Sequence, residues 1–74
     1  MPQDYQEFSR FLERLDEYLY ERGFYINGYY IRKNCQSYED VQKYLTKHCY
    51  DDSESANIVR KLKEETQNIL KSQE

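Results

Sequence analysis

The sequence predicts a mainly α fold of the α+β class, in which a three-helix cluster carries a short β-hairpin between its first and second helices. Three observations lead to this prediction. Apolar residues recur at helical spacing in three stretches, capping residues and Gly23 separate these stretches, and an Asn-Gly dipeptide divides two apolar triplets. With 74 residues, the chain 1–74 is expected to form one small domain.

The first helix is expected over about residues 5–22. Asp4 followed by Glu7 resembles a capping box, which favours a helix start there. Gly23 ends the pattern in the manner of a Schellman motif, with Phe24 as the next residue. Five apolar residues spaced three and four apart form the buried stripe: Tyr5, Phe8, Leu12, Leu15 and Leu19.

The hairpin is expected over about residues 24–31. Asn27-Gly28 suits a two-residue type I′ turn, because both positions tolerate a positive φ. The resulting register would expose Tyr25 and Tyr30 beside Arg32. It would hide the other four residues against the helices: Phe24, Ile26, Tyr29 and Ile31. The competing interpretation is a loop with a type I turn and no paired strands.

The second and third helices are expected over about 38–49 and 53–72. Ser37, with Asp40 three residues on, would cap the second, and Asp52 or Ser53 would cap the third. The expected core combines residues of all four elements: Phe8, Leu12, Leu15, Leu19, Phe24, Ile26, Ile31, Val41, Leu45, Cys49, Val59 and Leu62, with Ile58 and Ile69 at its edge.

Composition excludes several classes of protein. The net charge of −3 argues against a protein that coats nucleic acid non-specifically, although residues 24–50 carry a local excess of cations. No apolar run is long enough to span a membrane, and the first residues lack the apolar stretch of a signal segment, so we expect neither a membrane span nor a signal segment. Cys35 and Cys49 flank the second helix, too far apart for a disulfide, so we expect thiols in a reducing, cytoplasmic environment.

The sequence contains little that suggests catalysis. His48 precedes Cys49, but neighbours on a helix point about 100° apart and cannot act as a nucleophile and its base. The two cysteines and one histidine lack the paired spacing of a zinc site, and no glycine-rich phosphate loop is present. We therefore expect a protein that is not an enzyme, with no catalytic residue, metal or cofactor.

The nine tyrosines favour a protein-binding module, such as a small regulator, adaptor or inhibitor of an unidentified protein partner. The expected contact residues lie on the hairpin face, the basic connector behind it and the second helix: Tyr25, Tyr30, Arg32, Lys33, Lys43 and Lys47. Homodimerisation through the hairpin edge or the third helix is a variant of this hypothesis.

The alternative is nucleic-acid binding. Tyr25 and Tyr30 with the adjoining cations could stack single-stranded bases, or the second and third helices could act as a helix-turn-helix. Two features weigh against the duplex version: the acidic turn Asp51-Asp52 would approach the phosphates, and the positions that would read bases at the start of the third helix begin with Glu54.

Overall fold

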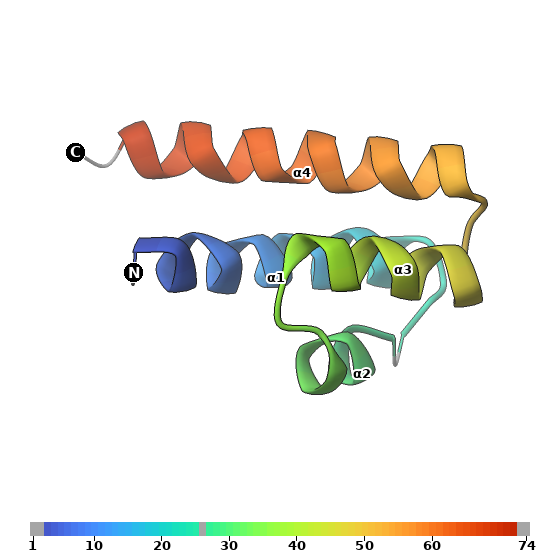
Figure 1. Ribbon diagram of the computed structural model, residues 1–74. Coiled ribbons are helices and arrows are strands. Elements are labelled where there is room, and N and C mark those ends of the chain that lie inside the picture. The colour runs from blue at the N-terminus through green and yellow to red at the C-terminus, as the bar shows by residue number, and fades with distance from the viewer. Residues whose placement is uncertain (1–2, 26, 73–74) are drawn as a thin grey trace.

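The computed structural model describes residues 3–25 and 27–72, and this part of the chain contains four helices and no strand (Figure 1). They are α1 (Gln3–Glu21), α2 (Asn27–Asn34), α3 (Tyr38–His48) and α4 (Asp52–Ser72). The mainly α prediction is confirmed, and the predicted β-hairpin between the first two long helices is wrong.

The helices α1 and α3 meet through side chains, such as the rings of Phe11 and Tyr38 at 4.8 Å, and the other two helices each pack against both of them (Figure 1). The long helix α4 packs against both α1 and α3 and runs antiparallel to them. The short helix α2 packs chiefly on α1 and less on α3, with its axis crossing theirs. None of the described helices is long and apolar enough to cross a membrane.

Residues 27–34 form a helix because its buried side has helical spacing. Gly28, Ile31 and Cys35 lie three and four residues apart, and all three are buried against the rest of the molecule. A glycine contributes no side chain to an apolar pattern, so the sequence conceals this stripe. The hairpin would have hidden Tyr29 beside Ile31, whereas Tyr29 is 61% exposed. Of the expected core residues, Ile26 lies outside the described part.

The end of α1 has the expected Schellman geometry. The Phe24 amide donates to the Leu19 carbonyl at 2.9 Å, and the Gly23 amide donates to the Tyr20 carbonyl at 3.1 Å. Gly23 has a φ of 92°, a region that favours glycine. At the other end α1 begins at Gln3, slightly earlier than expected, and the Asp4 side chain is outside the described part.

The core differs from the predicted one along α1. Phe11 is fully buried, while Phe8 and Leu12 are half-buried, so the stripe that faces the core is rotated toward Phe11. Cys35 is also a core residue, which the predicted connector did not anticipate. The buried hydrophobic residues are Phe11, Leu15, Leu19, Ile31, Cys35, Val41, Leu45, Ile58, Val59 and Leu62.

Side-chain caps fix the starts of the last two helices. The Ser37 hydroxyl accepts a hydrogen bond from the Asp40 amide at 3.2 Å, as the sequence predicts. At α4 the Asp51 carboxylate accepts from the Glu54 amide at 2.8 Å. Asp51 is therefore the cap of α4, and the prediction of Asp52 or Ser53 is wrong by one or two residues.

Candidate functional site

Tyrosine side chains gather where α1 ends and α2 begins. Four of them are exposed by 44–66% of their surface: Tyr20, Tyr25, Tyr29 and Tyr30. Tyr20 belongs to the last turn of α1, Tyr25 to the connection, and the other two to the first turns of α2. We call these four side chains the α2 aromatic surface.

Ring contacts hold the four side chains in two pairs. The Tyr20 and Tyr25 ring centroids are 4.9 Å apart, and those of Tyr29 and Tyr30 are 5.3 Å apart, both in edge-on arrangements. Such edge-to-face contacts favour one orientation of each ring over free rotation.

The contact between α1 and α2 brings the two pairs to one region. A Cβ atom added to Gly28 would lie 1.6 Å from Oδ1 of Asp16, so the α2 backbone lies directly against this carboxylate. Tyr20 is one helical turn beyond Asp16 on the same side of α1, and Tyr29 follows Gly28 in the chain. The two pairs therefore border the same helix contact.

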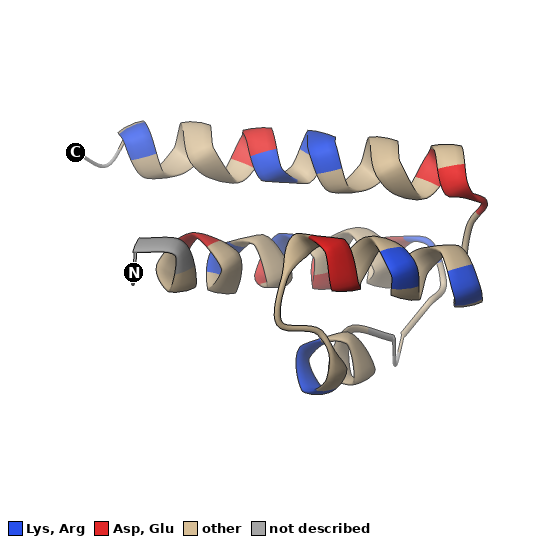
Figure 2. Ribbon diagram, in the orientation of Figure 1, with Lys and Arg blue, Asp and Glu red and all other residues tan. Residues whose placement is uncertain are grey.

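The cations of α2 have different surroundings. The Lys33 Nζ lies 5.8 Å from the centre of the Tyr29 ring, at the distance of a cation–π contact, and the residue is exposed. The Arg32 guanidinium pairs with the Asp16 carboxylate at 3.3 Å, so it helps to hold α2 on α1. Helix α2 itself carries no acid in its first turn (Figure 2).

Lys43 and Lys47 lie elsewhere, on α3. They line an open groove of about 390 Å³ between α3 and the start of α4, together with the acids Glu39 and Asp52. The Lys43 Nζ is 3.9 Å from the Glu39 carboxylate one turn away. The structure thus groups Tyr25, Tyr30 and Lys33 around α2, gives Arg32 a structural partner, and sets the two α3 lysines among acids.

Sequence reasoning left Tyr20 exposed, off the apolar stripe, but did not include it among the contact residues, and it missed Tyr29 as a surface residue. Tyr29 was assigned to the hidden face of the hairpin, and its helical signal is the spacing of four residues to Lys33. Tyr20 lies off the apolar stripe of α1, and only the position of α2 shows that it adjoins the other rings.

Two further tyrosines on the α3 side are half-buried: Tyr44 lies in α3 and Tyr50 follows it. Burial raises the pKa of Tyr44, and nearby Cys49, Cys35 and Tyr30 raise this pKa further. Burial likewise raises the pKa of Tyr50, whose ring packs 5.6 Å from that of Phe24.

Comparisons of the chain with protein-family models, with curated proteins and with solved structures find no match. Within residues 3–25 and 27–72, no three His, Cys, Asp or Glu side chains are grouped so that they could hold a metal ion. The candidate site is therefore defined by its exposed aromatic rings and the adjoining cation.

Proposed function

We propose that this chain is a small protein-binding module that docks a partner on the α2 aromatic surface. The observation that carries the proposal is the gathering of four exposed tyrosines at one helix contact. Tyrosine provides a large contact area with few rotatable bonds, and it is enriched in protein interfaces and their binding hot spots. This surface, formed by α1, the connection and α2, takes the place of the hairpin face that the sequence predicted.

The rings are also arranged in advance of binding. Their edge-on pairs and the Asp16–Gly28 contact restrict them before a partner arrives. A surface that is ordered beforehand loses less conformational entropy on association, so more of the contact energy remains as affinity.

Nucleic-acid binding is the second candidate, and the Lys33–Tyr29 pair is the observation that favours it. A cation beside an exposed ring is a common element of single-strand binding surfaces. The helix-turn-helix version has no support from the fold, because α4 runs back alongside α3 (Figure 1). Fluorescence titration with single-stranded and double-stranded oligonucleotides at several salt concentrations tests this candidate.

Affinity capture with three variants tests the protein-binding proposal. Tyr25→Ala/Tyr29→Ala removes two exposed rings that make no contribution to the core. Tyr5→Ala is the matched control, because Tyr5 is 77% exposed but lies about four turns from Tyr20 along α1. We expect the double variant to lose the partners that both the wild type and Tyr5→Ala retain. An identical set of captured proteins from all three chains would contradict the proposal.

A further inference from the structure

We infer that the α2 aromatic surface recognises an acidic segment of its partner, in which carboxylates alternate with apolar anchor residues. This inference rests on the proposed function and specifies the chemistry of the partner. It is based on the distribution of charge around α2.

The stretch of chain that builds most of this surface contains no acid. From Arg22 to Tyr38 there are three cations, whereas the whole chain contains 14 acids and 11 Lys and Arg residues. Figure 2 shows the contrast: α2 carries basic residues and no acidic ones, while acids are frequent on the long helices. A carboxylate brought to this region meets Lys33 and no repelling acid from α2.

Intrinsic helix stability explains only part of this charge pattern. Lys33 and Arg32 in the last turn complement the negative end of the helix dipole. The same dipole favours acids in the first turn of a helix, yet α2 has Tyr29 and Tyr30 there. The Asp16 carboxylate of α1 takes that place against Gly28. The chain therefore supplies the negative charge from α1 and keeps the outer side of α2 aromatic and basic.

A second copy of the chain fits this surface poorly. In a symmetric dimer the same patches face each other, so both copies bring the same set of charges, Lys33 with the exposed acids Glu17 and Glu21, into one contact. Like charges in such contacts are unfavourable, whereas an acidic segment would be attracted.

Single-stranded nucleic acid also fits less well. It places a phosphate at every nucleotide and needs cations along its path. Here Arg32 is already paired with Asp16, and the adjoining turn of α1 contains Glu17 and Glu21, both exposed. A peptide can place its carboxylates near Lys33 and apolar side chains near Tyr20 and Tyr25. The observed arrangement of charges favours the peptide.

Selection from a displayed library of random peptides of about 12 residues tests the inference without a known partner. The wild-type chain is the bait, and peptides that also bind Tyr25→Ala/Tyr29→Ala are removed. We expect the remaining peptides to contain at least about twice as many acids as cations, with aromatic or aliphatic residues between the acids. Selected peptides that are neutral or basic would overturn the acidic-partner inference and leave the proposed function intact. A selection that does not distinguish wild type from the double variant would overturn both.

Fluorescence anisotropy with one selected peptide then tests the role of Lys33. We expect Lys33→Gln to weaken binding at least about threefold, because it removes the exposed cation beside Tyr29. Lys61→Gln is the matched control, with the same charge change at an exposed position on α4. Equal affinities of the two variants, or an affinity that does not fall between about 50 and 300 mM salt, would contradict the inference. Tighter binding of single-stranded oligonucleotides, or a dimer that the double tyrosine variant dissociates, would also contradict it.

Discussion

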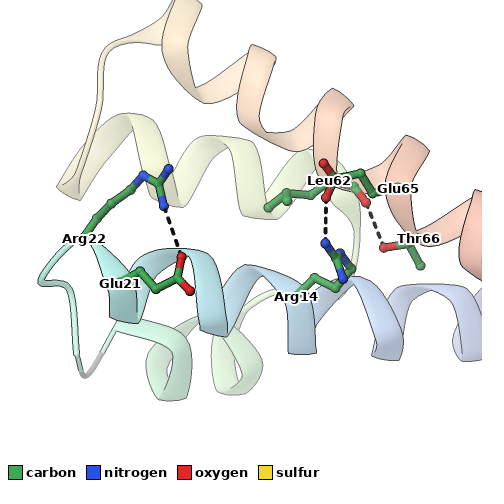
Figure 3. A network of polar contacts seen from close by, with 6 residues as sticks. All are labelled: Arg14, Glu21, Arg22, Leu62, Glu65 and Thr66. Atoms are coloured by element: carbon green, nitrogen blue, oxygen red, sulfur yellow. Dashed lines mark hydrogen bonds and ion pairs between the residues drawn. The ribbon is translucent and has the colours of Figure 1, made fainter.

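The two sides of the α1–α3 pair are covered in different ways. On one side the long helix α4 buries Ile58, Val59 and Leu62, and Arg14 of α1 pairs with Glu65 of α4 at 2.8 Å (Figure 3). On the other side the eight-residue α2 buries Gly28 and Ile31, and its residues 29, 30 and 32–34 are exposed. The α4 side is covered by a long helix of the same chain, and the α2 side presents exposed aromatic rings.

The difference has an energetic consequence. A helix of eight residues is unstable alone in water, so α2 depends on its contacts with α1 and α3. The long helices share a larger buried surface, and their unfolding is expected to be one cooperative event. We therefore expect α2 to open at a lower free energy than the rest of the molecule.

The largest loss of stability is expected for Phe11→Ala, on the closed part of the molecule. The Phe11 ring is fully buried and lies 4.8 Å from the ring of Tyr38, where α1 meets α3. Removing a buried phenylalanine side chain costs about 3–5 kcal/mol, which is comparable with the whole stability of a small domain. Urea denaturation followed by circular dichroism measures the change, with Tyr5→Ala as an exposed control. A loss below about 1 kcal/mol would show that this region is not the centre of the core.

Ile31→Ala tests the weaker side. Ile31 is 1% exposed, and truncating such a residue costs about 2–4 kcal/mol. The long helices also pack against one another without α2. We therefore expect the loss of stability to appear mainly as opening of α2. Hydrogen exchange should then accelerate in Tyr29 to Asn34 and stay slow in α1 and α4. Uniform acceleration across all four helices would show that α2 is part of the same cooperative unit.

Gly28→Ala has a smaller expected effect, of about 1 kcal/mol. Alanine favours a helix over glycine by roughly this amount, but its Cβ would displace the Asp16 carboxylate and disturb the pair with Arg32. We expect a net loss of stability in the wild type. In an Asp16→Ala background the displaced atoms are absent, so the same substitution should be stabilising. The same sign of effect in both backgrounds would rule out the close contact as the reason for the glycine.

Gly28 also explains how far the sequence determines the fold and the site. The three longer helices follow from apolar spacing and from Ser37 and Gly23, and each of these features is local. The helix 27–34 depends on a close contact between a glycine and Asp16, twelve residues earlier. Asn-Gly before an apolar residue has the same local signature in a type I′ hairpin and in a helix that packs through its glycine.

The exposed site was predictable only in part for the same reason. Tyr25 and Tyr30 were expected at the surface from the register of the hairpin, and Lys33 from the basic connector behind it; all three are exposed, although the segment is a helix and not a hairpin. The exposure of Tyr20 follows from its place off the apolar stripe of α1, but its position beside the other rings, and the exposure of Tyr29, required knowledge of where α2 lies. Arginine is a residue type that is common in binding surfaces, so the sequence predicted Arg32 as a contact residue. Its pairing with Asp16 could not be inferred without the position of α1.

The smallest effect is expected for Tyr50→Phe, in the connection between α3 and α4. The Tyr50 hydroxyl is buried and has no hydrogen-bond partner among the described residues, so its removal should leave stability at pH 7 equal or slightly higher.

Burial raises the pKa of Tyr50, as it does the pKa of Cys35 and Tyr44. A raised pKa means that the unfolded chain ionises first, so the stability that the neutral group contributes is complete below the unfolded pKa. This contribution falls as the pH rises above about 9 for the thiol and about 10 for the phenols. Urea midpoints measured from pH 7 to pH 10.5 should therefore fall in the alkaline range, and fall less in Tyr50→Phe. A variant that is less stable than wild type at pH 7, with an unchanged alkaline slope, would show that the hydroxyl is hydrogen-bonded in solution.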